Sequence, residues 1–335
     1  MPEPVREECG AGEGKRARQP AAHRARSRPA TRGNAAASPW QSLSQPYPVR
    51  SLAFSPDGEV LAVGSCGHLE LRSTASWAVL AALPGHVDWV HALAFSPDGA
   101  MLASTSHDPS RRVAIHLWDW RAGVMIDRLR GRKNWAEAVT FSPDGSLLAA
   151  GSDERVLVWQ LPERRLVKRL KVRLFDNSWF RSVAFSPCGA WFAAGGYDGV
   201  ACLWSARSWR PIRRFRGSIV AFSPDGETLV STYRGNVYLW DLQTGDLVQT
   251  FERPTRQEPS SQPNMHVMAL SPDGAVLAVG TDMAGRLCLH DVASGQMEFE
   301  AQGHDHIIDA LAFSPDGTTI ATGGRDRTVR LWRCA

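Results

Sequence analysis

Hydrophobic and polar positions form a unit of four short segments that recurs along the chain. In one such unit, apolar residues partly alternate with polar ones over residues 90–95, 101–104, 113–118 and 124–129. Short segments of this kind, separated by polar turns, are typical of β-strands. Each unit therefore predicts a four-stranded antiparallel meander, in which every strand is joined to the next by a tight turn.

A pentapeptide marks the turn after the first strand of every unit. It reads FSPDG at five positions, FSPCG once and LSPDG once, and it begins at Phe54, Phe95, Phe141, Phe185, Phe222, Leu270 and Phe313. Proline presets the φ angle at the first corner, aspartate bonds its own backbone, and glycine accepts a left-handed φ at the exit. Copies spaced 37 to 48 residues apart indicate a repeat architecture.

The predicted sheets carry apolar residues on both faces, so a single sheet cannot bury its core alone. Seven sheets arranged radially bury each face against a neighbour and leave no free end. A long sandwich of strands is the alternative, but a sandwich does not explain a fixed repeat of this length. The sequence therefore predicts an all-β fold, a single seven-bladed β-propeller of four-stranded antiparallel blades.

Further repeated dipeptides identify the kind of propeller. Trp-Asp begins at Trp118 and Trp240, tryptophan without aspartate stands at Trp159, Trp204 and Trp332, aspartate without tryptophan follows His290, and Gly-His begins at Gly85 and Gly303. With these dipeptides and the seven turns, residues 38–335 resemble the WD-repeat family of β-propellers. The resemblance implies a non-catalytic scaffold or adaptor that binds a protein or peptide partner and needs no cofactor.

The last unit stops at Trp332, at the end of its third strand. Residues 39–44 precede the first inner strand, where a fourth strand of the last blade is expected. We predict that this N-terminal strand pairs with the last blade and closes the ring, as the resemblance implies. Closure removes an exposed sheet edge, which would otherwise promote aggregation.

Two repeats contain histidine, a hydroxyl residue, aspartate and tryptophan in the order of the family's buried hydrogen-bonded group. The sets are His86, Ser104, Asp108 and Trp118, and His304, Thr322, Asp326 and Trp332. A buried tryptophan N–H needs an acceptor, and the other three side chains complete a satisfied network. The alternative is a catalytic triad. We favour the structural role, because the network is expected inside the blade.

Net charge separates the first 37 residues from the rest of the chain. The chain has 38 basic and 34 acidic residues, and residues 1–37 hold eight of the basic and four of the acidic ones. The net charge of +4 therefore belongs to this segment, and residues 38–335 are formally neutral. We predict a disordered basic N-terminal tail over residues 1–37, because its composition lacks apolar periodicity. A neutral propeller argues against nucleic acid as its partner, and association of nucleic acid with the basic tail is the alternative.

Targeting and metal-binding patterns are missing from the sequence. No apolar segment is typical of a secretory signal or long enough to span a membrane. The six cysteines form no CxxC pair, which favours a reduced, cytoplasmic protein without a membrane partner. No motif for phosphate or zinc binding occurs, so we expect no metal, no cofactor and no catalytic residue. We expect the propeller by itself to be monomeric.

Two sets of positions differ among the repeats and are candidates for partner binding. Counting back six residues from the start of each turn gives Pro48, Trp89, Trp135, Trp179, Arg216, Asn264 and Ile307. Counting back four gives Arg50, His91, Glu137, Arg181, Ser218, His266 and Asp309. Both sets are expected just before or at the start of the inner strands, on the face opposite the turns. Exposed tryptophan and arginine dominate binding hot spots, so we predict that partners bind here.

Two other interpretations of these positions stay open. The tryptophans can tilt inward and cap the core between blades, because large aromatic side chains are usually mostly buried. The alternative is an enzyme site, of a hydrolase or lyase, at the channel mouth, on which His91, Glu137, Arg181, His266 and Asp309 converge. Convergence within hydrogen-bond distance in a pocket favours chemistry, whereas an open rim with exposed tryptophan favours docking.

Overall fold

The computed structural model describes residues 38–107, 112–133, 136–153, 155–171, 179–251, 265–281 and 285–334. Among these residues, the side chains at positions 107, 112–114, 131–133, 265 and 266 are not described. The predicted disordered tail, residues 1–37, lies outside the described residues, so its disorder stays a prediction.

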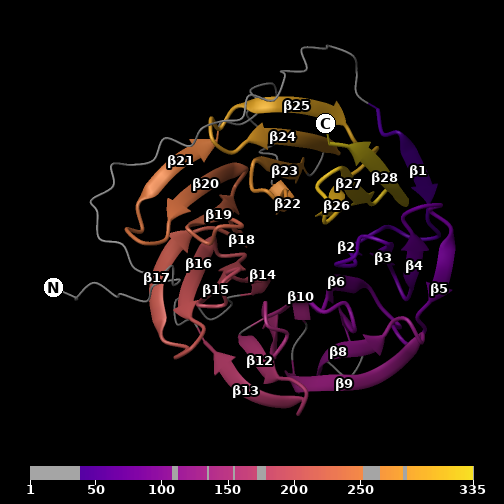
Figure 1. Cartoon of the computed structure of the whole chain (residues 1–335), viewed down its shortest axis with the longest axis horizontal. Helices are drawn as coiled ribbons and strands as arrows, with labels where there is room; N and C mark the ends of the chain where they lie inside the picture. The colour runs from indigo at the N-terminus through magenta and orange to yellow at the C-terminus, as the bar shows by residue number, and fades with distance from the viewer. Residues whose placement is uncertain are drawn as a thin grey trace.

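Seven sheets stand radially around a central channel, and each sheet contains four antiparallel strands (Figure 1). From the centre outward, the first three blades are β2 (Ser51–Phe54), β3 (Val60–Gly64), β4 (Leu69–Ser73) and β5 (Val79–Ala82); β6 (Val90–Phe95), β7 (Leu102–His107), β8 (Arg112–Asp119) and β9 (Val124–Lys133); and β10 (Ala136–Phe141), β11 (Leu147–Ser152), β12 (Val156–Gln160) and β13 (Arg165–Leu170). The fourth and fifth are β14 (Phe180–Phe185), β15 (Trp191–Gly196), β16 (Val200–Ser205) and β17 (Pro211–Arg216); and β18 (Ile219–Phe222), β19 (Thr228–Tyr233), β20 (Asn236–Asp241) and β21 (Leu247–Phe251). The last two are β22 (Met265–Leu270), β23 (Val276–Thr281), β24 (Arg286–Asp291) and β25 (Met297–Gln302); and β26 (Ile308–Phe313), β27 (Thr319–Gly324), β28 (Thr328–Arg333) and β1 (Gln41–Ser44).

These sheets confirm the predicted seven-bladed propeller. In the second blade, β6 has the predicted bounds, whereas β7, β8 and β9 extend beyond the apolar segments that predicted them. The additional residues are mostly polar, and the backbone ladder continues through them because strand pairing needs no apolar side chain.

The N-terminal strand closes the ring as predicted. β1 pairs antiparallel with β28, with Gln41 opposite Leu331 and Leu43 opposite Val329. Leu43 is 8% exposed and packs in the cluster between the seventh and first blades. The closing strand therefore contributes both backbone pairing and core contacts.

The seven pentapeptide turns have the predicted geometry. Their glycines have φ angles between +66° and +75°, in the left-handed region that favours glycine. In the first turn, Ser55 donates a hydrogen bond to Asp57, and Asp57 accepts another from the Glu59 amide. A Cβ atom on Gly58 would lie 3.6 Å from the ring of Pro315 in the preceding turn. The turns therefore pack against one another around one face of the ring.

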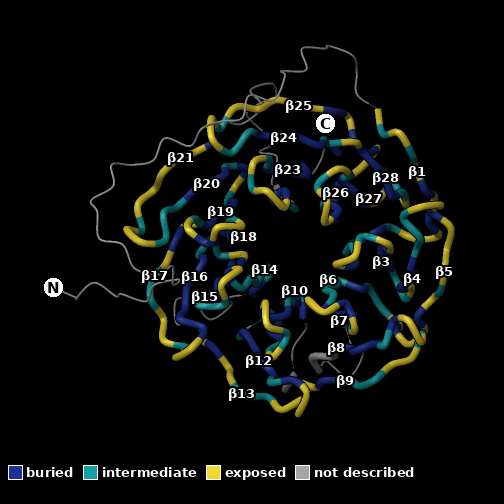
Figure 2. Tube along the Cα trace, viewed as in Figure 1, coloured by how far each residue is buried: buried dark blue, intermediate teal, exposed yellow. Residues whose placement is uncertain are grey.

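The core is divided among the spaces between neighbouring blades. Seven clusters of buried apolar side chains fill these spaces, so every blade is packed on both faces. Between the second and third blades, for example, Ile115 and Leu117 pack with Leu148 and Trp159. Burial is greatest in the middle strands, while the outermost strands are mostly exposed (Figure 2).

Candidate functional site

The inner strands begin on the face opposite the pentapeptide turns, and we call this the top face. The first residues of these strands surround a cavity of about 480 Å³ at the mouth of the central channel. Its lining includes Arg50, His91, Glu137, Arg181 and Asp309. The structure therefore brings together, around one cavity, five of the seven residues that precede the pentapeptide turns by four positions.

Asp309 organises one side of the channel mouth. Its carboxylate lies 3.2 Å from Arg50 Nη1 of the first blade and 2.8 Å from Arg325 Nε of its own blade. The Asp309 side chain is 6% exposed, whereas the two arginine side chains are 31% and 39% exposed. The Arg50 guanidinium also lies 5.4 Å from the centre of the Trp89 ring. A buried carboxylate thus fixes two arginines that stay accessible to a partner.

Tyr197 organises the opposite part of the lining. Its hydroxyl donates a hydrogen bond of 2.9 Å to Glu137 Oε2. The Arg181 guanidinium lies 4.8 Å from the centre of the Tyr197 ring, and the Trp179 ring packs edge-on at 6.4 Å. Partial burial, together with the nearby Glu137 carboxylate, raises the pKa of Tyr197. The phenol therefore stays protonated at neutral pH and acts as a hydrogen-bond donor.

Tyr197 and Arg325 were not among the predicted site residues. Both follow the second strand of their blade and directly precede an aspartate, Asp198 or Asp326. The amide of Tyr197 donates to the carbonyl of Trp179, and the amide of Arg325 donates to that of Ile307. This shared backbone bond places them on the top face. Aligning the repeats on the aspartate as well as on the pentapeptide would have found both.

Two predicted contact positions do not have the expected placement. Only two residues separate β17 of the fourth blade from β18 of the fifth. Counting back six residues from Phe222 therefore reaches Arg216, the last residue of β17, and not the start of the inner strand. Ile307 is 7% exposed, so its side chain packs inside the protein, where an aliphatic group is most stable. Trp135 and the side chain of His266 lie outside the described residues.

The two described tryptophans of the top face both keep accessible surface. Trp89 is half-buried, and Trp179 is 36% exposed. The exposed Trp179 is therefore not buried between blades, whereas the partial burial of Trp89 leaves the inward-capping interpretation open for that ring. Trp89 contacts Arg50, one of the two arginines paired with Asp309. Trp179 contacts Tyr197, whose hydroxyl donates to Glu137.

The charged groups of the lining hold one another in place. Asp309 binds two arginines and Glu137 accepts a hydrogen bond from Tyr197, so both carboxylates are engaged with neighbouring side chains. Within the described part of the chain, no three His, Cys, Asp or Glu side chains lie close enough to hold a metal ion. Nor does any helix of that part have the length and apolar character to cross a membrane. The geometry of the mouth suits recognition of charged and polar groups.

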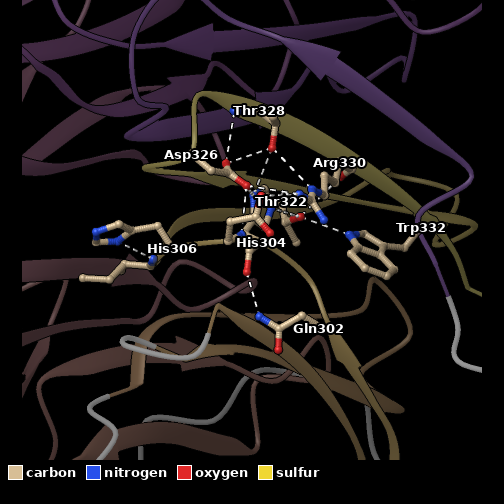
Figure 3. A network of polar contacts seen from close by, with 10 residues as sticks. Gln302, His304, His306, Thr322, Asp326, Thr328, Arg330 and Trp332 are labelled. Atoms are coloured by element: carbon tan, nitrogen blue, oxygen red, sulfur yellow. Dashed lines mark hydrogen bonds and ion pairs between the residues drawn. The ribbon is translucent and has the colours of Figure 1, made fainter.

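The histidine network of the seventh blade lies inside the sheet (Figure 3). Trp332 Nε1 donates to the Thr322 hydroxyl at 3.0 Å, and that hydroxyl lies 2.7 Å from His304 Nε2. His304 Nδ1 lies 2.9 Å from the Asp326 carboxylate and therefore carries the proton. The four side chains Trp332, Thr322, His304 and Asp326 are thus joined by an unbroken series of hydrogen bonds.

Burial decides between the structural and the catalytic interpretation of this network. Burial alone would raise the pKa of Asp326, but hydrogen bonds from His304, Thr328 and the Asp305 amide hold the pKa well below its ordinary value. The hydroxyl, imidazole and carboxylate lie in the order of a catalytic triad, yet Thr322 and His304 are both 0% exposed. A substrate has no access to the hydroxyl, so the network stabilises the blade.

The second blade has a related network with a different partner for its histidine. His86 Nε2 lies 2.7 Å from Ser104 Oγ, and Trp118 Nε1 donates to the same oxygen at 2.8 Å. His86 Nδ1 lies 2.8 Å from Ser106 Oγ. The predicted partner Asp108 lies outside the described residues. The His86 ring also stacks on His116, with ring centres 4.2 Å apart.

Lowering the pH from 7 to 5 is expected to destabilise the propeller through His86. Burial, with repulsion from His116 and Arg128, lowers the pKa of His86 to about 3. The unfolded histidine has a pKa of about 6.5, so below that pH the unfolded state binds the proton first. This loss of stability begins near pH 6.5, grows toward pH 3 and amounts to roughly 2 kcal/mol at pH 5.

Thermal unfolding at a series of pH values tests this expectation. His86→Gln removes the titrating group, so its melting temperature should be lower than wild type at pH 7 but should fall less between pH 7 and pH 5. If the melting temperatures of wild type and His86→Gln fell equally between pH 7 and pH 5, groups other than His86 would cause the loss of stability in acid.

Comparison with known proteins supports the assignment of the repeats independently of the structure. The family profile described as "WD domain, G-beta repeat" matches residues 38–71, 77–110, 123–160, 169–205, 209–241 and 295–333. An uncharacterized WD repeat-containing protein of Synechocystis sp. is 34% identical over 125 residues, which are 36% of this chain and 33% of that protein. The serine-threonine kinase receptor-associated protein of Homo sapiens is 30% identical over 116 residues, 35% of this chain and 31% of that protein. Protein groucho of Drosophila melanogaster is 32% identical over 114 residues, 34% of this chain and 15% of that protein. The chain thus spans about a third or less of the length of these relatives.

Proposed function

Because the chain belongs to the WD-repeat family of β-propellers, we propose that it is a non-catalytic scaffold that binds a protein or peptide partner on its top face. Propellers of this family are typically protein-interaction scaffolds. The channel mouth, with Arg50, His91, Glu137, Arg181 and Asp309 in its lining, forms the centre of the binding surface.

One observation supports this position above the others. At the channel mouth, partly exposed aromatic rings lie directly beside charged groups that the protein already holds in place. Trp89 lies against Arg50, and Trp179 and Tyr197 lie beside Arg181 and Glu137. Aromatic and arginine side chains that are ordered before binding lose little entropy when a partner docks, and they are the residue types that dominate hot spots.

Affinity capture with matched variants tests the proposal. The top-face variant carries Trp89→Ala, Trp179→Ala and Tyr197→Ala, and the control carries Val79→Ala, Leu80→Ala and Val124→Ala. The control removes exposed apolar side chains from outer strands, far from the channel mouth. Since truncation of a central hot-spot residue costs about 2 kcal/mol, the top-face variant should lose the partners that wild type and control retain.

Two results would contradict the proposal. The first is equal recovery of the same partners by the top-face variant and wild type. The second is unfolding of the top-face variant, seen as a large drop in melting temperature, because the rings would then belong to the core.

We further propose that the protein acts in the cytoplasm. Cys202 and Cys288 are free, buried thiols, and burial raises their pKa values to about 11 and about 12. Such thiols behave as small hydrophobic side chains and suit a reducing compartment. Cell fractionation followed by immunodetection tests this location, and recovery only from the culture medium would contradict it.

A further inference from the structure

The formal neutrality of the propeller conceals a strong separation of charge around its outer edge. In the second, third and fourth blades, residues 120–130, 161–171 and 206–216 comprise the outer strand and the turn before it, apart from the last three residues of β9. These residues carry thirteen basic side chains and only two acidic ones, Asp127 and Glu163. The matching segments of the other blades, residues 38–44, 74–82, 242–251 and 292–302, contain three acidic side chains and no basic one.

We call the basic residues of these three blades the basic edge. Its members are Arg121, Arg128, Arg130, Arg164, Arg165, Lys168, Arg169, Lys171, Arg207, Arg210, Arg213, Arg214 and Arg216. Most of them are exposed, and only Arg128 and Arg213 are half-buried. β9, β13 and β17 follow one another along the convex outside of the ring (Figure 1), so the basic residues belong to three neighbouring outer strands.

Strand register shows that the three blades place basic residues at equivalent positions. In each of these blades the second-to-last residue of the third strand is a tryptophan, and it pairs with one outer-strand residue, namely Met125, Leu166 or Pro211. Three and five residues further along, the pairs are Arg128 and Arg130, Arg169 and Lys171, and Arg214 and Arg216. Residues two apart on a strand share a face and lie about 7 Å apart, so each of these three blades presents the same pair of cations.

The sixth blade shows the opposite charge at this position. Its outer strand pairs Met297 with His290, and three residues further stands Glu300. Glu300 accepts from Arg286 of the same blade at 2.6 Å, so that charge is neutralised within the blade. On the basic edge, only Arg121 and Arg164 have a carboxylate of the described residues within ion-pair distance, Asp57 and Asp127. The remaining cations are not compensated by acidic residues of the described chain.

Protection of sheet edges does not account for this arrangement. Charged residues on an exposed outer strand prevent sheets of different molecules from pairing. Every blade has such a strand, yet the outer strands β5, with sequence VLAA, and β21, with sequence LVQTF, carry no charge at all. A requirement common to seven blades cannot explain a concentration of one sign on three of them.

We propose that the basic edge binds a flexible acidic polypeptide segment of a partner protein, on a surface separate from the top face. Arginine forms paired hydrogen bonds with carboxylates, and eleven of the thirteen cations are arginines. A flexible chain follows a convex surface across three blades, whereas duplex DNA, with a persistence length of about 150 base pairs, has to be bent at a cost in free energy.

Single-stranded nucleic acid fits the basic edge less well than an acidic polypeptide. In proteins that bind single strands without sequence preference, the bases stack on exposed aromatic side chains. The three segments contain Trp120, Trp209 and Phe215 as their aromatic residues. Trp120 and Phe215 are buried, and Trp209 packs against Phe185 and Phe192, so no ring is presented for stacking.

Binding of a labelled poly-glutamate peptide to the full chain tests the proposal. A peptide of about 20 residues reaches around several strands at ~3.3 Å per residue. The edge variant carries Arg130→Gln, Arg169→Gln, Lys171→Gln and Arg214→Gln, all at exposed positions. The control variant carries Arg24→Gln, Arg26→Gln, Arg28→Gln and Arg32→Gln, which change the net charge of the chain by the same amount.

We expect the edge variant to bind the peptide at least about tenfold more weakly than wild type, with an unchanged melting temperature, because four exposed ion pairs are lost. The control should bind like wild type, and wild-type binding should weaken with added salt. Equal weakening in both variants would show that only net charge matters. Tighter binding of a DNA duplex of the same total charge would overturn the choice of an acidic polypeptide.

Discussion

Deletion of residues 1–46 is expected to lower the melting temperature by roughly 10 °C or more. The deletion removes β1, its pairing with β28 and the buried side chain of Leu43. Loss of a buried leucine alone typically costs about 2–5 kcal/mol, the lost strand pairing adds to this cost, and in a domain of about 300 residues each kcal/mol shifts the melting temperature by roughly 1.6 °C. The unpaired edge of β28 is also expected to promote aggregation on heating.

Deletion of residues 1–36 is the matched control for this truncation. It leaves β1 and the residues just before it intact, so the melting temperature should equal that of the full chain. Differential scanning calorimetry of the three proteins measures the effect. Equal melting temperatures for the two truncated proteins would mean that β1 does not hold the ring closed.

Thr322→Val is expected to destabilise the protein by about 3 kcal/mol. Valine matches the shape of threonine but has no hydroxyl, so Trp332 Nε1 and His304 Nε2 both lose their partner inside the blade. Each buried polar group left without a hydrogen bond costs about 1–3 kcal/mol. Urea unfolding should show a lower midpoint with an unchanged slope, because the surface exposed on unfolding stays the same.

Thr105→Val is the matched control, because it replaces a buried threonine with valine without removing a hydrogen bond. Thr105 is 0% exposed, and its hydroxyl has no hydrogen-bond partner among the described residues. Replacing it with valine removes a buried, unsatisfied group and should leave stability unchanged or higher. Similar losses of stability in both variants would contradict the proposed role of the Thr322 network.

The fold could be predicted from the sequence because its determinants are local and repeated. The pentapeptide fixes each turn through proline, aspartate and glycine geometry, and seven copies then require seven sheets. Residues 39–44 could be assigned to the last blade because that blade otherwise lacked an outer strand. No side-chain detail was needed for either conclusion.

The candidate site was predicted less completely, because loop lengths differ between blades. Counting back from the turn gave Arg50 and Asp309, which the structure brings together, but it misplaced Arg216 where the connecting loop is short. Tyr197 and Arg325 come from a different loop, whose length the count does not include. Burial of Ile307 depends on packing between elements, which the local pattern does not contain.

The basic edge depends on a different kind of information. The positive and negative residues of the propeller cancel in number, and this neutral net charge predicted a surface that does not bind polyanions. Strand pairing assigns Arg128, Arg169 and Arg214 to equivalent positions on neighbouring blades, which net charge cannot reveal. Sorting of charge by blade becomes visible only when the register of the outer strands is known.

The central claim, that partners bind at the channel mouth of the top face, is tested most directly by dissociation constants. A captured partner is titrated against wild type, the Trp89/Trp179/Tyr197 alanine variant and the outer-strand Val79/Leu80/Val124 control. We expect the top-face variant to bind more than about tenfold more weakly at an unchanged melting temperature, since hot-spot truncations typically cost about 2 kcal/mol. The control should match wild type. Equal dissociation constants for the top-face variant and wild type would contradict the account.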